Sequence, residues 1–145
     1  MELVVQGICG WSQANMAVVG SSLGGYYASW VAQQTGCPSV VLNPAVDPAR
    51  DLARYIGEQT AWHDPTQRLF FRAEYIDELH ALDVRGRPPA GPELALIAHG
   101  DELLDWREMA ARYAQACQIV RAGGDHALSE FPALLPQVVE FLNLA

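Results

Sequence analysis

Short apolar runs alternate along this chain with stretches whose apolar residues recur at helical spacing. Each run is bounded by glycine, proline or polar residues, which is typical of a strand buried on both faces of a parallel sheet. Such runs lie at residues 17–20, 39–43, 94–98 and 118–120. Helical spacing covers residues 23–34, 48–58, 67–82, 106–116 and 134–144. The alternation predicts an α/β fold, a three-layer sandwich in which helices cover both faces of a mostly parallel sheet.

Particular residues mark two of the predicted helix ends. Gly36 follows the first helical stretch and is expected to end it in a left-handed conformation. Asp105 precedes the stretch that begins at Trp106, and Glu108 is placed to complete a capping box. The start of the chain carries no such signal, so the pattern there leaves open a helix or a short strand followed by a loop.

The chain of 145 residues has the size of one domain. Residues 47–92 separate the second predicted strand from the third. Two of the predicted helices begin in this segment, and we expect it to form a helical, cap-like insert within the single domain.

The charge balance excludes several classes of function. Seventeen acidic residues stand against nine arginines, and the formal net charge is −8. The arginines are scattered, so the chain lacks the concentrated basic face that nucleic acid or an anionic membrane requires, and we expect neither as a partner. The chain also contains no lysine, which excludes a P-loop phosphate site, a Schiff-base enzyme and a Ser–Lys dyad.

No apolar run approaches the roughly 20 residues that cross a bilayer, and no basic leader opens the chain, so we expect a cytoplasmic protein. The cysteines at 9, 37 and 117 form no CxxC pair and are expected to be buried or half-buried thiols. The four histidines show neither HExxH nor HxxxH spacing. We therefore expect no metal and no cofactor.

The strongest chemical signal is GSSLG at residues 20–24, which reads G-x-S-x-G and lies where a predicted strand turns into a helix. Such a turn holds the serine in a strained conformation and lifts its Oγ above the sheet, so Ser22 is the candidate nucleophile. The backbone N–H of Leu23 is the candidate oxyanion donor. A glycine-rich turn that only packs helix on strand is the alternative. A dinucleotide loop fits less well, because the next strand ends in Asn43 rather than an acid.

A serine hydroxyl needs a base, which should follow a later strand at the same edge of the sheet. His126, in GGDH after the strand at 118–120, meets this requirement and is the candidate base. His99 ends a strand at the same edge, but the expected chain order of serine, acid and histidine disfavours it, so we expect it to pack the loop. His63 and His80 fall in the middle segment and are expected to face solvent.

Several carboxylates compete for the role of the acid that orients the histidine. Asp101 lies nearest the end of the third strand, where a carboxylate can be held rigidly, and is the first candidate. Asp105 is second, because capping the next helix explains it better, and Glu102 is expected to face solvent. Asp125 is discounted because the side chains of adjacent residues such as His126 usually diverge.

In these residues the chain resembles the YqiA-type esterases, a small bacterial branch of the α/β-hydrolases. The similarity is carried by VVGSSLGGYYASW at 18–30, VVLNPAVDP at 40–48, HGDELLDWRE at 99–108 and GGDHAL at 123–128, and it covers nearly everything from residue 16 onward. It implies an α/β-hydrolase fold and a hydrolase of carboxylic esters or thioesters. It also implies that Ser22 is the nucleophile, Asp101 the acid and His126 the base.

The resemblance departs from the family pattern at the N-terminus. Relatives begin with a further strand and an oxyanion loop, and too few positions separate Gly7 from Ser22 for this chain to hold the helix and strand that follow that loop. We therefore expect N-terminal strands to be missing. Losing one oxyanion donor costs on the order of 10²–10³ in rate. The loss would also expose an apolar sheet edge, through which the chain could form a homo-oligomer.

The favoured function is a serine esterase that hydrolyses short- to medium-chain carboxylic esters, so the expected partner is a small-molecule ester or thioester. An acyl-CoA thioesterase or acyltransferase would use the same three residues, and a catalytically impaired hydrolase-like module would only bind. Aromatic rings of the insert could line an acyl pocket, although such rings also pack helices. These rings belong to Trp62, Phe70, Phe71 and Tyr75.

Overall fold

The computed structural model describes residues 1–61 and 64–144. The chain forms two compact units: Met1–Val46 together with the chain from Val84 onward, and Asp47–Asp83. Residues 84–92, which we assigned to the insert, therefore belong to the larger unit.

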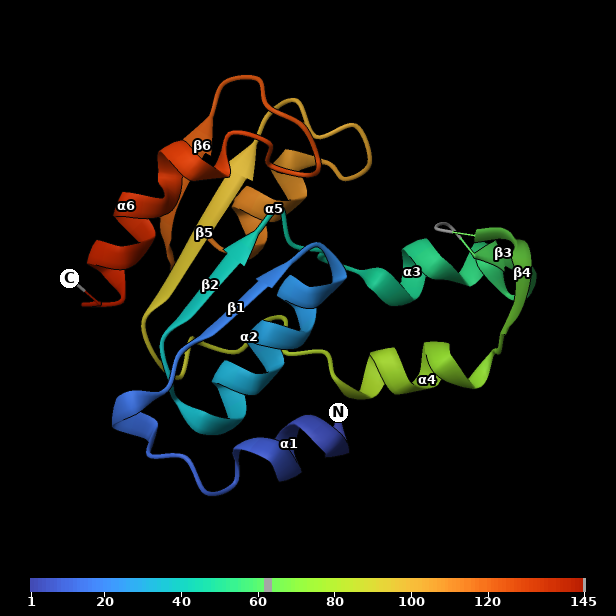
Figure 1. The fold of residues 1–145 in the computed structure, drawn as a ribbon, viewed down its shortest axis with the longest axis horizontal. Helices are drawn as coiled ribbons and strands as arrows, with labels where there is room; N and C mark the ends of the chain where they lie inside the picture. Colours follow the sequence, from blue (N-terminus) through green and yellow to red (C-terminus); the bar gives the residue numbers. More distant parts are fainter. Residues whose placement is uncertain (62–63, 145) are drawn as a thin grey trace. The chain divides into compact units, whose positions relative to one another are not determined.

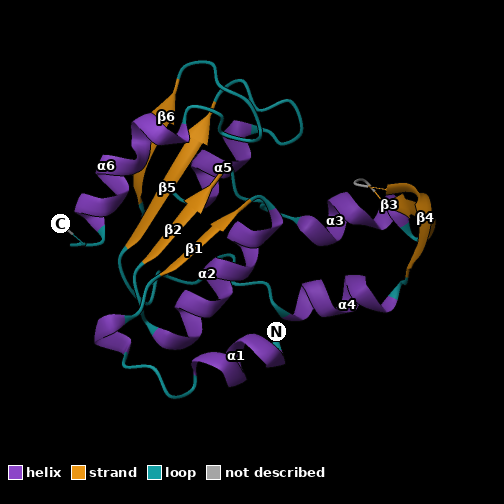
Figure 2. Cartoon of the chain, viewed as in Figure 1, coloured by secondary structure: helices purple, strands orange, loops and turns teal. Residues whose placement is uncertain are grey.

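The larger unit is built on a four-stranded sheet in the order β1-β2-β5-β6, in which every neighbouring pair is parallel. Its strands are β1 (Val18–Ser21), β2 (Ser39–Leu42), β5 (Glu93–Ala98) and β6 (Cys117–Arg121). They are the four predicted strands, with no bound shifted by more than one residue. Because all four run in the same direction, their carboxyl ends meet at one edge of the sheet (Figures 1 and 2).

Helices cover both faces of this sheet, as the alternation in the sequence predicts. Those of the larger unit are α1 (Glu2–Ile8), α2 (Leu23–Thr35), α5 (Trp106–Arg112) and α6 (Phe131–Phe141). Leu94 and Leu96 pack with Leu134 of α6 on one face. Ala95 and Ile97, which alternate with them, belong to the cluster that α2 and α5 cover on the other face. β5 is thus apolar on both faces, and each buried leucine or isoleucine contributes about 1.5–3 kcal/mol of transfer free energy.

Two predicted helix ends are confirmed. Gly36 has a φ of 71° and its N–H donates to the carbonyl of Ala32, which ends α2 in the left-handed conformation. The carboxylate of Asp105 accepts a hydrogen bond from the N–H of Arg107 at 2.9 Å and caps α5. The start of the chain, which the pattern left open, forms α1 and a 3₁₀ turn at Gln13–Asn15.

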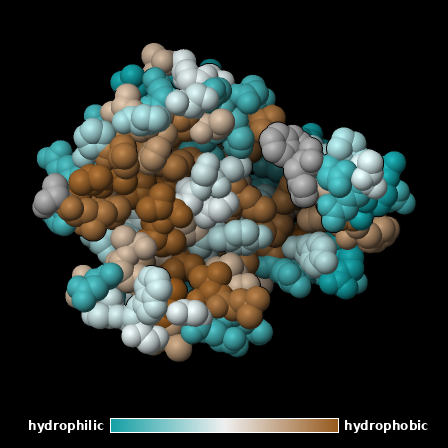
Figure 3. Space-filling view, viewed as in Figure 1, coloured by the Kyte–Doolittle hydropathy of each residue, from teal (hydrophilic) through white to brown (hydrophobic). Residues whose placement is uncertain are grey.

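β1 forms one end of the sheet and pairs only with β2 in the described part of the chain. The side chain of Val19 on this strand is 51% exposed. Apolar surface also gathers over α6 (Figure 3), where Leu135 is exposed. Association of the chain through the β1 edge stays a prediction.

The smaller unit corrects the prediction of an all-helical insert. It contains α3 (Pro48–Leu52), a 3₁₀ turn (Ala53–Tyr55), β3 (Gly57–Ala61), β4 (Asp64–Phe71) and α4 (Glu74–Ala81). β3 and β4 pair antiparallel, so the helices expected at 48–58 and 67–82 are each partly replaced by strand.

The physical reason lies in Gly57 and in the two-residue period that follows it. Gly57 has a φ of 121°, which a helix cannot contain, and the burial of β3 then alternates residue by residue. The Arg68 guanidinium lies across the hairpin, 3.7 Å from the carboxylate of Glu58. Such cross-strand pairs stabilise a hairpin and have no counterpart in a helix at that spacing.

The thiols differ from the prediction. Cys37 is buried, as expected, but Cys9 and Cys117 are exposed, and all three are free. Among the described residues, no helix combines the length and apolarity that a membrane span needs.

Candidate active site

The turn between β1 and α2 holds Ser22 in a strained conformation, with φ 54° and ψ −123°. A non-glycine residue at such angles costs on the order of 1–3 kcal/mol and persists only where its surroundings fix it. The N–H of Ser22 donates to the carbonyl of Leu42 at 2.9 Å. Its carbonyl accepts from the N–H groups of Gly25 and Ala45, each at 3.0 Å. The tight strand-to-helix turn that the motif predicts is therefore present and is tied to β2.

The glycines of this turn have different steric roles. A Cβ on Gly20 would lie 2.1 Å from the carbonyl oxygen of Gly24, and a Cβ on Gly25 would lie 2.8 Å from the Cβ of Pro44. A Cβ on Gly24 would meet no described atom within 4 Å. Close packing of strand and helix therefore requires Gly20 and Gly25, whereas Gly24, the second glycine of the motif, is free to carry a side chain.

Gly20→Ala and Gly24→Ala are expected to differ sharply in stability. Gly20→Ala should lower the free energy of unfolding by about 1–3 kcal/mol or more, because the added methyl overlaps backbone that cannot move aside. Gly24→Ala should be neutral or stabilising by up to about 1 kcal/mol, because alanine is the better helix former. Urea unfolding of both variants measures the difference, and equal destabilisation would contradict the steric argument.

Ser22, His126 and Asp101 form a continuous hydrogen-bonded chain at the carboxyl edge of the sheet. The Nε2 of His126 lies 2.9 Å from the Oγ of Ser22, and its Nδ1 lies 2.8 Å from the Oδ2 of Asp101. The Asp101 side chain is fully buried and that of His126 is 18% exposed. Imidazole and hydroxyl are therefore within proton-transfer distance, and the carboxylate can hold the ring in one tautomer.

Asp101 is fixed in orientation by its own loop. Its Oδ1 accepts hydrogen bonds from the N–H groups of Leu103 and Leu104, both at 2.8 Å. These two donors leave Oδ2 to face His126. The carboxylate is therefore held in one orientation toward the imidazole.

Glycines bring the loop of the acid against the loop of the histidine. Gly123 and Gly124 have φ values of 80° and 82°, a conformation that side chains disfavour. The N–H of Gly100 donates to the carbonyl of Gly123 at 2.9 Å. A Cβ on Gly100 would lie 2.3 Å from the carbonyl oxygen of Gly124, so glycine is required for this approach.

The other candidate carboxylates accept hydrogen bonds from other groups. Glu102, which we expected only to face solvent, accepts a hydrogen bond from the backbone N–H of His126 at 2.9 Å. Asp125 accepts from both the N–H and the hydroxyl of Ser129, and these hydrogen bonds lower the pKa of its carboxyl. Asp105 caps α5. The carboxylate that contacts the His126 ring is that of Asp101.

The remaining histidines are placed as follows. The His99 ring stacks on the indole of Trp106 with their centroids 4.0 Å apart, which fits the predicted packing role. His80 is exposed on α4. His63 lies outside the described residues.

The start of α2 presents an unused donor beside Ser22. The N–H of Leu23 donates no hydrogen bond to any residue in the described part of the chain. The first N–H groups of a helix have no partner within it and favour negative charge. This N–H is therefore available to donate to a negatively charged oxygen beside Ser22.

Three of the four aromatic residues proposed for an acyl pocket lie in the smaller unit. Phe70 and Phe71 are on β4 and Tyr75 is on α4. Phe70 is 64% exposed, and the rings of Phe71 and Tyr75 meet edge to face with centroids 5.4 Å apart. Trp62 lies outside the described residues. Their assignment to an acyl pocket stays a prediction.

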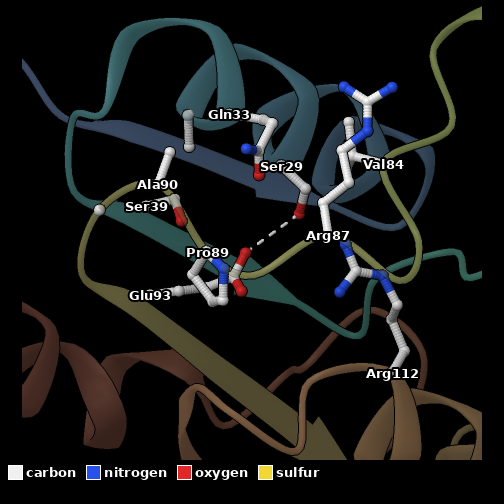
Figure 4. A pocket seen from close by; sticks show the side chains of 11 residues that line it. Ser29, Gln33, Ser39, Val84, Arg87, Pro89, Ala90, Glu93 and Arg112 are labelled. Atoms are coloured by element: carbon white, nitrogen blue, oxygen red, sulfur yellow. Dashed lines mark hydrogen bonds between the residues drawn. The ribbon is translucent and has the colours of Figure 1, made fainter.

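A second polar cluster, which the sequence does not indicate, lies at the opposite, amino edge of the sheet (Figure 4). The Ser29 hydroxyl donates to the Glu93 carboxylate at 3.3 Å and lies 3.0 Å from the Tyr113 hydroxyl. Burial raises the pKa of Tyr113 to about 12. Burial also raises the pKa of the Glu93 carboxyl, although attraction to Arg112 opposes this effect. The cavity beside these groups is small, about 10 Å³.

Glu93→Gln is expected to raise the midpoint of thermal unfolding near neutral pH. Because burial raises the pKa of Glu93 in the folded state, ionisation of this carboxyl costs stability as the pH rises through the folded-state pKa. Glutamine cannot ionise and keeps an oxygen for Ser29. The advantage of the variant should shrink below the ordinary value of 4.5, where glutamate is protonated in both states. Thermal unfolding across this pH range tests it, and a variant less stable at neutral pH would contradict it.

Metal ligands do not gather anywhere in the described residues: no group of three or more histidine, cysteine, aspartate or glutamate side chains is arranged to hold an ion.

Comparison with known proteins places this geometry in a family. Residues 1–143 match the profile of the uncharacterised protein family UPF0227. A putative hydrolase from Agrobacterium vitis is similar in structure, with a TM-score of 0.66 and 17% identity over 87% of this chain and 60% of that chain. Est1E from Butyrivibrio proteoclasticus has a TM-score of 0.63 and 19% identity over 87% of this chain and 58% of its own.

A third similar structure is the mouse α/β-hydrolase domain-containing protein 10, with a TM-score of 0.62 and 18% identity over 97% of this chain and 68% of that one. The chain thus spans about 60% of the length of the first two structures. Three observations lead to the same assignment: the parallel sheet, the family match along almost the whole chain and the sequence resemblance. The chain has an α/β-hydrolase fold and belongs to the uncharacterised protein family UPF0227, the YqiA family.

Proposed function

We propose that this chain is a serine hydrolase that cleaves carboxylic esters of short to medium acyl chain length through an acyl-serine intermediate. The observation that carries the proposal is the hydrogen-bonded chain from the Ser22 Oγ through the His126 ring to the Asp101 carboxylate. A strained serine joined to an imidazole that a buried carboxylate orients is the arrangement that activates a hydroxyl for attack on a carbonyl.

The reaction begins when the Nε2 of His126 takes the proton of Ser22 and the Oγ bonds to the ester carbonyl carbon. The carbonyl oxygen becomes an oxyanion, to which the N–H of Leu23 donates. The carbon–oxygen bond to the alcohol then breaks, and His126 returns the proton to the leaving alkoxide. Water gives a proton to His126 as its oxygen bonds to the acyl carbon. The bond from that carbon to Oγ then breaks, His126 returns the proton to Oγ, and the carboxylic acid is released.

The similar structures support this class of chemistry. A similar structure from Rhodothermus marinus is named as an esterase domain, and one structure of Est1E holds ferulic acid, an aromatic carboxylic acid. The net charge of −8 favours neutral over anionic substrates. No cluster of arginines in the sequence indicates recognition of a phosphorylated acyl carrier, which disfavours the thioesterase alternative.

The test is covalent labelling of the folded chain with a fluorophosphonate probe, followed by mapping of the modified residue by mass spectrometry. We expect the label on Ser22, a burst of p-nitrophenol from p-nitrophenyl butyrate, and no label in a heat-denatured sample. Absence of label from a folded sample would overturn the proposal in favour of a binding module. Faster turnover of butyryl-CoA than of the ester would instead support a thioesterase.

A further inference from the structure

Asn43 follows β2 directly and is a buried polar residue in an unusual backbone conformation. Its side chain is completely buried and its φ is 39°. Asparagine tolerates left-handed angles better than most residues other than glycine. Glycine would adopt these angles with less strain, so the backbone alone does not explain an asparagine here. The role of the residue must be sought in its amide.

The amide of Asn43 uses each of its polar atoms. Its Nδ2 donates to the backbone carbonyls of Asp125 and His126 at 2.9 and 3.1 Å. Its Oδ1 accepts from the N–H of Ala98, at the end of β5, at 2.8 Å. Both N–H donors of the amide are thus consumed by the loop that carries the candidate base. The Asp125 carbonyl also accepts from the N–H of Leu128, at 3.1 Å.

These hydrogen bonds fix the backbone on both sides of the His126 Cα. Asn43 holds the carbonyl before His126 and the carbonyl of His126 itself. The N–H between them donates to Glu102. The two peptide planes that set the direction of the imidazole are therefore held by side chains from other segments of the chain.

The preceding glycines do not set the direction of the histidine by themselves. Gly123 and Gly124 lack side chains, and the hydrogen bond that the Gly123 carbonyl accepts from Gly100 lies three residues before His126. The imidazole nevertheless has to reach Ser22 and Asp101 at 2.9 and 2.8 Å together. A displacement of about 1 Å in such an arrangement can cost roughly 10²-fold in rate.

We propose that Asn43 is a positioning residue that holds His126 in register between Ser22 and Asp101. The expected effect on catalysis rests on the proposed function. The expected effect on the position of His126 rests on the hydrogen bonds of Asn43 alone. Asn43 touches no reacting atom: it acts through the two carbonyls that flank the histidine.

Asn43→Gly removes the amide and permits the same φ. We expect kcat for p-nitrophenyl butyrate and the rate of fluorophosphonate labelling to fall together by roughly 10- to 100-fold, with KM changed by less than about threefold. The NMR resonance of the His126 Nδ1 proton, shared with Asp101, should shift or broaden. This spectroscopic readout requires no catalysis.

The matched control is Ser29→Ala, which removes a buried side chain hydrogen-bonded to Glu93 and Tyr113 at the opposite edge of the sheet. It should lower the unfolding midpoint and leave kcat and the His126 resonance unchanged. If Asn43→Gly behaves in the same way, Asn43 is merely structural and the proposal is overturned.

Asn43→Asp provides a second variant of nearly unchanged size should Asn43→Gly fail to fold. Burial favours a protonated carboxyl there, and its single O–H can satisfy only one of the two carbonyls. We expect a smaller loss of kcat and a smaller change of the His126 resonance, and wild-type values of both would overturn the proposal. If the wild-type chain is not labelled at all, the proposed function fails, and the resonance alone decides the role of Asn43.

Discussion

Ser22→Ala is expected to abolish fluorophosphonate labelling and to lower ester turnover by roughly 10⁴–10⁶-fold, because it removes the hydroxyl that the imidazole would activate. The Oγ of Ser22 is the atom that the Nε2 of His126 contacts, at 2.9 Å. Alanine experiences the same strain at a φ of 54°, so the turn should be retained. Circular dichroism and thermal unfolding check that the fold survives.

Ser21→Ala is the matched control for this variant. Ser21 is adjacent in the sequence, is the last residue of β1 and is exposed. Its side chain has no hydrogen bond to His126 among the described residues. Labelling and turnover should therefore stay near the wild-type values in Ser21→Ala. Loss of labelling in Ser21→Ala with retention in Ser22→Ala would show that Ser21, and not Ser22, is the nucleophile.

The sequence is sufficient to predict the sheet because its strands carry a local signal. Each of the four parallel strands is apolar enough to be recognised without knowledge of its neighbours, and β5 is buried along almost its whole length. The turn at Ser22 follows from glycines placed between a strand and a helix. Chain order separates His126 from His99, and closeness to the end of the third strand favours Asp101 over the other carboxylates. The structure brings these two side chains together with Ser22.

The hairpin is missed because its signal is weaker than that of the strands in the core. β4 is exposed along most of its length, so apolar residues do not alternate cleanly with polar ones. A strand that is stabilised mainly by its partner across the hairpin has only a weak hydrophobic pattern in its own sequence. Gly57 is the residue that could have indicated the break in the predicted helix.

The residues that hold His126 are missed for a different reason. Asn43 and Glu102 act through backbone groups of a loop that is distant in the sequence, 82 residues away in the case of Asn43 and Asp125. No spacing rule connects such residues. In the sequence Asn43 is informative only as a polar residue at the end of an apolar strand, where it argues against a dinucleotide site.

Asp101→Asn is expected to lower kcat by roughly 10⁴-fold while leaving the fold intact, because it reverses the tautomer of His126. In the wild type, Oδ1 accepts from two backbone N–H groups, those of Leu103 and Leu104. In the variant only the amide oxygen can take that position, so the NH₂ group must face the Nδ1 of His126. That nitrogen then has to accept, and the ring proton moves to Nε2.

An imidazole protonated on Nε2 cannot receive the proton of Ser22, so geometry is kept while base catalysis is lost. Asp105→Asn is the control, because asparagine also caps helices and the α5 cap should be retained. Its kcat should stay within about threefold of the wild-type value. Nitrogen chemical shifts of the imidazole would report the exchanged tautomer in Asp101→Asn directly. Full activity in Asp101→Asn would mean that the two N–H groups of its loop do not dictate which end of the side chain meets the histidine.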